Sequence, residues 1–316
     1  MITESKEFVN LNGELCSSSS ASVGIWNGGT QYGYGLFETL RTYGSVFFAW
    51  SEHYQRMALG CRSLHMNLPF SEKEGLEQLE KLQNCYFEHG EKEDAVFRVT
   101  VTPSSIKNWN LGKTMYIITR RPIPDLTSKQ VNGVPVAVLT TPRSSSATAA
   151  RIKGISFTDI VLARQEMRSY NLPTGEACEE GLMLNEAGRI VEATCSNVFF
   201  VFRESVTGAP TLVTPPESDG PLLGITRRHV LQIAEHLQIP VLERSVFAND
   251  IIRAEEIFLT NAVQELVPVS TVVQNGRNLY TMWESGAPCM PYARDKSGTI
   301  TQQILQRYKQ FIILKK

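Results

Sequence analysis

The chain has 316 residues, of which 42% are hydrophobic and 20% are charged. This balance is typical of a soluble globular protein and excludes a disordered or fibrous one. Lysine and arginine total 31 against 32 for aspartate and glutamate, so no charge excess favours nucleic acid or an anionic membrane as a partner. We expect small-molecule partners, and the length predicts two domains, each with its own core.

Targeting and metal signals are absent from the sequence. The opening MITESKEFVN has no signal-peptide pattern, and no later stretch approaches the roughly 20 apolar residues of a membrane helix, so we expect a cytoplasmic protein. The six cysteines include no C-x-x-C pair, which favours reduced thiols. The five histidines include no H-x-x-x-H pair, so no metal site is predicted.

The first part of the chain predicts a small α+β domain. Residues 35–50 predict a hairpin around Gly44, because β-branched and aromatic residues flank a turn signal. Two helices follow, over residues 53–66 and 71–88, and Ser71 with Glu74 has the form of a capping box at the start of the second. Strands at AVFRVTVTP and TMYIITRRP then complete a domain that we expect to cover residues 1–124.

The second part predicts a mixed α/β domain. We expect an interdomain strand, VPVAVLTTP, and a small-residue loop within residues 125–151, and a larger domain over 152–316. That domain begins with a helix over 156–169 and continues with the strand patterns GLMLN and SNVFFVF. Strand and helix patterns alternate from LVTPP through GITRRHVLQIAEHLQ, PVLERSV and EEIFLTNAV to a final helix at ITQQILQRYKQFI.

Four segments, read in order, resemble the class IV aminotransferase family, also called fold-type IV pyridoxal 5′-phosphate (PLP) enzymes. They are YGYGLFETLRTYGSVFFAWSEHYQRM, IKGISFTDIVLARQE, GLMLNEAGRIVEATCSNVFFV, and TPPESDGPLLGITRRHV followed by EEIFLTNAVQELVPV. The resemblance implies an α/β fold of the D-amino acid aminotransferase-like type, in which an α+β N-terminal domain precedes a larger, barrel-like C-terminal domain. It also implies a homodimer and PLP as the cofactor.

The resemblance implies a role in cofactor binding for several residues. Lys153 matches the lysine that binds PLP as a Schiff base and moves protons, whereas alone it would be read as a surface charge. Glu192 matches the acidic residue aimed at the pyridine nitrogen, which keeps the ring an electron sink. The remaining matches are the phosphate contacts and the residue that packs on the ring: Arg56, Ile225, Thr226 and Thr260 for the phosphate, and Leu222 for the ring. Gly224-Ile225-Thr226 opens a helix, where unpaired amides form an anion site.

Candidate substrate contacts are Arg98, Tyr32, Phe37 and Ala262. Arg98 is a charge within an apolar strand, so it either snorkels to solvent or binds a carboxylate. Tyr32 and Phe37 resemble the walls of the side-chain pocket in branched-chain members, and either could instead be core. Trp26-Asn27-Gly28-Gly29 departs from the family pattern. The D-amino-acid branch carries Arg-Gly after the strand that here ends near Thr102, and the lack of this pair disfavours that branch.

Three functions remain open. The first is an aminotransferase that moves an amino group between an amino acid, branched-chain among the candidates, and a 2-oxo acid. The second is 4-amino-4-deoxychorismate lyase, which makes 4-aminobenzoate and pyruvate, and which Phe37-Glu38-Thr39 and Ser196-Asn197 resemble. The third is a non-catalytic module that keeps the fold.

Overall fold

The computed structural model describes residues 7–144, 152–172, 174–203, 208–282 and 299–314. The chain divides into two compact units, and each has its own hydrophobic core. Unit 1 comprises the described residues up to Pro124 together with Ile152–Phe157. Unit 2 comprises the described residues of 125–144 and 158–314.

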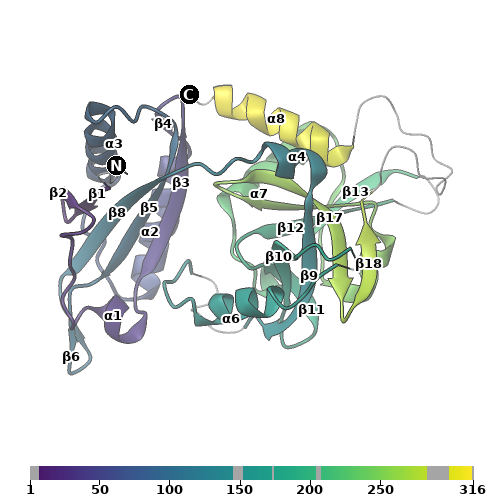
Figure 1. Ribbon diagram of the computed structural model, residues 1–316, viewed down its shortest axis with the longest axis horizontal. Coiled ribbons are helices and arrows are strands. Elements are labelled where there is room, and N and C mark those ends of the chain that lie inside the picture. The colour runs from purple at the N-terminus through teal and green to yellow at the C-terminus, as the bar shows by residue number, and fades with distance from the viewer. Residues whose placement is uncertain (1–6, 145–151, 173, 204–207, 283–298, 315–316) are drawn as a thin grey trace. The chain divides into compact units, whose positions relative to one another are not determined.

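Unit 1 is built on a six-stranded antiparallel sheet (Figure 1). The strand order is β2-β1-β8-β5-β3-β4. Their bounds are β1 Phe8–Leu11, β2 Glu14–Ser17, β3 Leu36–Tyr43, β4 Val46–Phe47, β5 Ala95–Pro103 and β8 Thr114–Pro122. A short hairpin of β6 Ile106–Lys107 and β7 Asn110–Leu111 lies outside this sheet. The hairpin predicted around Gly44 is β3 with β4.

Two helices pack against the sheet of unit 1 and enclose its core. They are α2 Trp50–Ser63 and α3 Glu72–Glu88, and a short α1 Gly28–Tyr32 precedes them. Apolar side chains of α2 and α3 meet alternate residues of β3 and β5, including Leu36, Leu40 and Phe97. The predicted capping box is present, since Ser71 Oγ accepts from Glu74 N and the Glu74 carboxylate accepts from Ser71 N.

Unit 2 is built on a mixed sheet of ten strands. Nine of them follow the order β14-β13-β12-β16-β17-β9-β10-β11-β15, and β18 pairs with β17. Their bounds are β9 Val134–Pro142, β10 Glu180–Leu184, β11 Arg189–Ala193, β12 Asn197–Arg203, β13 Pro210–Thr214, β14 Val241–Glu243, β15 Val246–Phe247, β16 Glu256–Asn261, β17 Glu265–Gln274 and β18 Arg277–Thr281. Side chains from strands far apart in this order share one core cluster, so the sheet curves around it, as the barrel-like expectation requires.

Helices cover the outer face of this sheet. The bounds of these helices are α4 Thr127–Asn132, α6 Thr158–Met167, α7 Ile225–His236 and α8 Ile300–Leu314. Two 3-10 turns, η1 Glu217–Asp219 and η2 Ala248–Arg253, complete the unit, and Ile251 of η2 belongs to the inner core. Helix α6 contacts β9 and β10, whereas α7 and α8 contact β16 and each other (Figure 1). Phe200 faces the inner core, and its neighbour Phe199 stacks on Phe258 with 5.0 Å between ring centroids. Burial on both faces explains the unbroken apolar run of β12.

The division into units differs from the sequence-based one in two segments. The described residues of 125–144, expected to be interdomain, belong to unit 2, where β9 pairs with β10 and β17. Residues 152–157 were expected to open the larger domain, but they pack with unit 1. Their backbone pairs with the start of β3, because Phe37 N donates to Lys153 O and Ile155 N donates to Gly35 O. The small-residue loop expected over 144–150 lies almost entirely outside the described residues.

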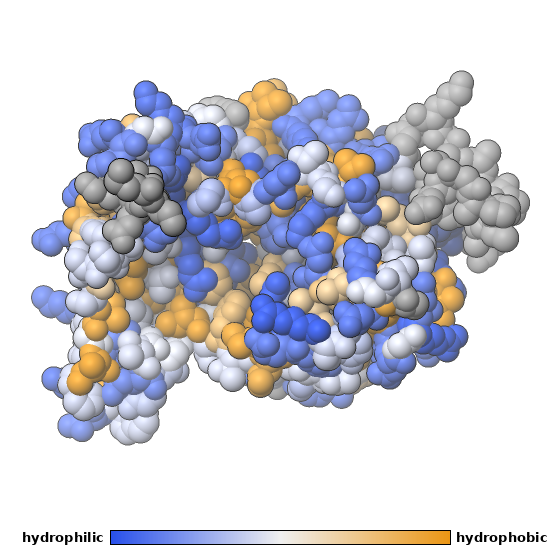
Figure 2. Space-filling view, in the orientation of Figure 1, coloured by the Kyte–Doolittle hydropathy of each residue, from blue (hydrophilic) through white to orange (hydrophobic). Residues whose placement is uncertain are grey.

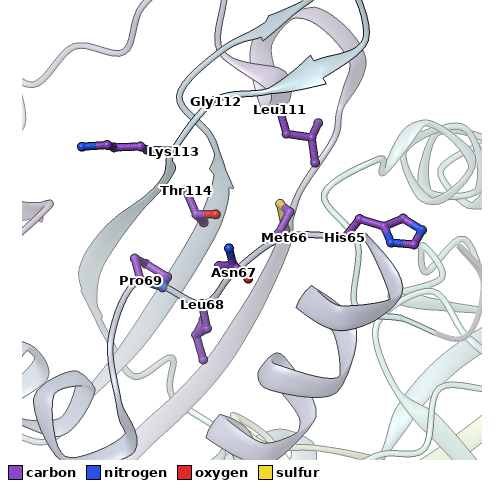
Figure 3. Close-up of a pocket in the computed structure, with 9 residues that line it drawn as sticks. All are labelled: His65, Met66, Asn67, Leu68, Pro69, Leu111, Gly112, Lys113 and Thr114. Atoms are coloured by element: carbon purple, nitrogen blue, oxygen red, sulfur yellow. The ribbon is translucent and has the colours of Figure 1, made fainter.

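The surface is mostly hydrophilic on the face seen in Figure 2, with apolar groups scattered over it. Within the described residues, no helix combines the length and the apolar character needed to cross a membrane. A pocket of about 260 Å³ in unit 1 is lined by residues 65–69 and 111–114 (Figure 3). None of the candidate site residues lines it.

Candidate active site

Lys153 lies against the first residues of β3. Its carbonyl accepts a hydrogen bond of 2.9 Å from Phe37 N, and the next residue, Gly154, forms a β-bridge with Leu36. These backbone contacts fix the lysine beside the Phe37 side chain, and Lys153 Nζ lies 4.6 Å from the centroid of the Phe37 ring. The lysine is half-buried.

The Phe37 ring is the meeting point of three side chains. The Arg98 guanidinium lies 3.6 Å from its centroid and the Phe157 ring 5.3 Å away, in addition to Lys153. Arg98 Nε also donates to Thr100 Oγ1 at 3.3 Å, and the residue is exposed. Phe37, Arg98 and Lys153 are therefore brought together, with two cationic groups over one buried aromatic ring.

Tyr32, the other candidate pocket wall in unit 1, ends the short helix α1. It is 52% exposed, and its ring centroid lies 5.9 Å from that of Trp109. The departure at Trp26–Gly29 has a structural explanation here. Asn27 is the N-cap of α1, since its Oδ1 accepts from Gly29 N and Thr30 N, and its Nδ2 donates to Pro103 O.

Arg56, on α2, forms a bidentate ion pair with Glu38. Arg56 Nε donates to Glu38 Oε1 and Nη2 to Oε2, each at 2.7 Å, and His53 Nδ1 lies 2.7 Å from the same Oε2. Burial by itself would raise the pKa of Glu38, but the Arg56 charge and these hydrogen bonds outweigh it and lower the pKa to about 2. Burial also lowers the pKa of His53, and the charges of Arg56 and Lys153 act in the same direction.

In unit 2, the Glu192 carboxylate accepts hydrogen bonds from Arg143, Leu222 and Asn197. Arg143 Nε donates to Oε1 at 3.1 Å, while Leu222 N donates to Oε2 at 3.0 Å and Asn197 Nδ2 to Oε2 at 3.4 Å. The ion pair with Arg143 and the backbone amide favour the ionised form of a carboxyl that is 7% exposed. Glu192 and Leu222, predicted separately, are thus neighbours.

The N-terminus of α7 lies beside this carboxylate. Asn197 Nδ2 also donates to Leu222 O at 2.7 Å, and a side chain at Gly224 would come within 2.1 Å of Asn197 Oδ1. Gly224 is the N-cap of this twelve-residue helix and provides no side-chain cap for its first amides. Ile225 and Thr226, the first two helical residues, are buried, so their amides lie at a helix end that favours an anion.

Thr260, on β16, is paired in register with Asn197 on β12. Its hydroxyl oxygen is buried and is one of the described polar atoms without a hydrogen-bond partner. Such an atom normally costs free energy, so it marks a place where a ligand oxygen would be accommodated. Ala262 follows in the turn after β16 and is half-buried.

These residues fit PLP. A carboxylate fixed by Arg143 suits a protonated pyridine nitrogen, and the uncapped amides of α7 with the orphan Thr260 hydroxyl suit a phosphate. A metal would need a different set, and among the described residues no group of three His, Cys, Asp or Glu side chains could hold one.

The residues that hold the candidates in place were not assigned that role from the sequence: His53 and Arg143 were not singled out, and Glu38 and Asn197 were named only for their resemblance to the lyase branch. Glu38 was the easiest to find, because a carboxylate within an apolar strand that also carries Leu36 and Leu40 requires a buried cation. Arg143 had no comparable signal, since its partner Glu192 lies 49 residues away in the sequence.

A model of the family described as amino-transferase class IV matches residues 35–272, which is more than half of the chain. The chain belongs to the class IV aminotransferase family. The family resemblance inferred from the sequence is therefore confirmed, and members of this family are PLP-dependent enzymes.

Relatives within the family carry different activities in their names. The D-alanine aminotransferase of Bacillus licheniformis is 28% identical over 284 residues, which are 89% of this chain and 91% of that protein. The aminodeoxychorismate lyase of Bacillus subtilis is 24% identical over 271 residues, 84% of this chain and 86% of that protein.

A solved structure confirms the fold. The crystal structure of a branched-chain aminotransferase from Thermoproteus uzoniensis with norvaline superposes with a TM-score of 0.79 at 27% identity. The match covers 98% of this chain and 96% of that one. The α/β fold expected from the sequence is thus shared over nearly the whole length.

Proposed function

We propose that this class IV enzyme is a PLP-dependent aminotransferase that moves an amino group between an amino acid and a 2-oxo acid. The observation that carries the proposal is the cluster in unit 2. There, a carboxylate fixed by an arginine and a backbone amide lies beside an uncapped helix N-terminus and an orphan buried hydroxyl. Branched-chain aminotransferases among the similar structures support the same class.

When bound, PLP supplies an electron sink for the α-carbon of the substrate. In our proposal Lys153 is the covalent attachment point of the cofactor, and its amine then moves a proton from the α-carbon as general base and acid. Glu192 accepts a hydrogen bond from the pyridine nitrogen and keeps it protonated. The amides of Ile225 and Thr226, the Thr260 hydroxyl and Arg56 donate to the phosphate.

The substrate side of the proposal rests on the Phe37 ring. We assign Arg98 to the substrate carboxylate, because its guanidinium lies over Phe37 in the same neighbourhood as Lys153 Nζ. Phe37, with Tyr32 and Ala262, would form apolar walls for the side chain, as a branched-chain substrate needs. A homodimer belongs to the proposal on family grounds, and sedimentation of the loaded enzyme tests it. A cytoplasmic location belongs to it on the sequence pattern alone.

The test is a visible spectrum of the PLP-loaded protein during titration with L-glutamate, L-leucine and D-alanine, and separately with aminodeoxychorismate. Loss of the cofactor's absorption band with an amino acid, and its return with a 2-oxo acid, would establish amino transfer and identify the donor. If amino acids leave the band unchanged and aminodeoxychorismate yields pyruvate, the lyase function replaces the aminotransferase function. Aminodeoxychorismate is included because the relative from Bacillus subtilis is an aminodeoxychorismate lyase. A protein that takes up no PLP would contradict both and favour a non-catalytic module.

A further inference from the structure

Glu38 is a fully buried carboxylate that the proposed chemistry does not use. It lies in β3 and is 1% exposed, yet both of its oxygens are engaged. Arg56 binds them with two parallel hydrogen bonds of 2.7 Å, and His53 Nδ1 lies 2.7 Å from Oε2. A forked pair of this kind fixes the plane of the guanidinium as well as its position.

The two partners of Glu38, His53 and Arg56, differ in how far their side chains are exposed. The side chain of Glu38 is 1% exposed and that of His53 is 2% exposed, whereas that of Arg56 is 20% exposed. The carboxylate is therefore wholly inside unit 1, and the guanidinium reaches from it to the surface of the unit. Glu38 engages two of the five N–H donors of the guanidinium, one on Nε and one on Nη2, so the ion pair does not use the whole donor capacity of the arginine.

The same strand supports the proposed catalytic lysine. Residues alternate along β3, so Phe37, which lies under Lys153 Nζ, and Glu38, which holds Arg56, project to opposite faces. The backbone N–H of Phe37 donates a hydrogen bond to the backbone carbonyl of Lys153. Two adjacent residues of one strand thus set the place of the lysine and of the arginine.

We propose that Glu38, supported by His53, is a positioning residue that holds the Arg56 guanidinium in the orientation that binds the cofactor phosphate. This inference rests on the proposed function, in which Arg56 contacts the phosphate. Glu38 itself touches no part of the cofactor and acts through Arg56. Its effect should therefore appear only with a ligand that carries the phosphate.

The experiment compares PLP with pyridoxal, which lacks the phosphate, as ligands of the full-length chain freed of cofactor. Binding is followed by the absorption of the bound aldehyde, so the readout does not depend on turnover. In Glu38→Gln the fork loses its charge and one acceptor, and we expect PLP to bind about tenfold more weakly while pyridoxal changes by less than about twofold. Glu80→Gln, an exposed carboxylate on α3, is the matched control and should leave both affinities unchanged.

The outcomes separate this inference from the proposed function. If the wild-type chain prefers PLP over pyridoxal and Glu38→Gln retains that preference, the positioning role is overturned while the function stands. Equal weakening of both ligands would mean that Glu38 only supports the fold, which also overturns the inference. A wild-type chain without any preference for PLP would remove the phosphate role of Arg56 itself.

A second variant, Glu38→Asp, tests the proposal if Glu38→Gln does not fold. Glu38→Asp keeps the buried charge opposite Arg56 and withdraws it by one methylene, so the ion pair survives with an altered geometry. We expect an intermediate loss of the preference for PLP in this variant. Full preference in a folded Glu38→Asp protein would contradict the requirement for a fixed guanidinium.

Discussion

At the scale of single residues, the candidate site depends on charges that are buried and held by partners. Glu192 and Glu38 are both less than a tenth exposed, and each binds an arginine. A buried carboxylate without its partner would be strongly destabilising. Arg143 and Arg56 therefore compensate two buried carboxylates: Glu192, which the proposed chemistry uses directly, and Glu38, which it does not.

Lys153→Ala is expected to remove the cofactor's covalent anchor. The absorption band of the loaded protein should disappear, and turnover should fall by about 10²–10⁴-fold or more, because the base that moves the α-proton is lost. Absorption spectra and rates of amino transfer measure the two effects. Lys107→Ala, an exposed lysine on β6, is the control, and a Lys153→Ala protein that keeps both band and rate would disprove the assignment.

Glu192→Gln is expected to separate binding from chemistry. The glutamine can still accept from Leu222 N, so PLP should remain bound, but it does not keep the pyridine nitrogen protonated. We expect turnover to fall by about 100-fold or more, the size of an electrostatic contribution in an active site. Full activity with bound PLP would rule out the role at the pyridine nitrogen.

Glu38 is expected to make the fold sensitive to acid. Its pKa is about 2 in the folded chain and 4.5 in the reference state, so the carboxylate stabilises the fold above pH 4.5 and the stabilisation is lost as the pH falls toward 2. The contribution is about 3 kcal/mol. Chemical denaturation between pH 6 and pH 3 should show a smaller loss of stability in Glu38→Gln than in Glu80→Gln; identical pH profiles would contradict the shifted pKa.

At the scale of secondary-structure elements, the start of α7 organises the polar cluster of unit 2. Gly224 lies so close to Asn197 that the two residues leave no room for a side chain between them. Asn197 in turn bonds Leu222 O and the Glu192 carboxylate. The helix start, β12 and the proposed pyridine-binding carboxylate are therefore coupled through one amide side chain.

Gly224→Ala is expected to disturb that coupling. The φ of −67° and ψ of 141° at Gly224 suit alanine, so the effect is steric and comes from a Cβ placed 2.1 Å from Asn197 Oδ1. We expect a loss of about 1–3 kcal/mol in stability, as in other overpacked sites, together with weaker PLP binding. Thermal unfolding and PLP titration measure both. Gly24→Ala, where nothing lies within 4 Å, should be neutral.

At the scale of the whole molecule, the two units do not correspond to two continuous halves of the sequence. Residues 152–157 carry Lys153 and belong to unit 1, although the described residues on both sides of them, 125–144 and 158–314, belong to unit 2. The segment that carries the lysine is thus a short part of unit 1 inserted between two parts of unit 2 in the sequence. Its position is secured by backbone bonds to β3.

Cofactor binding is expected to stabilise the whole chain. PLP at 100 times its dissociation constant adds about 2.7 kcal/mol to the free energy of unfolding. At about 2–4 °C per kcal/mol for a domain of this size, the Tm should rise by about 5–10 °C. Scanning calorimetry with and without PLP measures the shift. A rise of the same size in Lys153→Ala would mean that the covalent anchor contributes nothing to binding.

Much of the fold followed from local patterns. Strand patterns predicted the bounds of β5 and β8 correctly, turn signals predicted the hairpin of β3 and β4 to within three residues, and the capping box fixed the start of α3. The short helix α1 and the β6–β7 hairpin were missed, because five residues and two-residue strands are too short to produce a periodic pattern. Local sequence patterns gave no indication of the contacts between the family's motif residues.

The sequence by itself determined the family, and the four ordered motifs that identify it also nominate the two residues on which the proposed chemistry depends, Lys153 and Glu192. Only the tertiary structure decided their partners: Arg143 for Glu192, and β3 for Lys153. It also revealed that Arg56, expected at a phosphate, is held by Glu38. The physical reason is range, since periodicity and motifs report on neighbours along the chain, whereas ion pairs and sheet register join residues 18 to 49 or more positions apart.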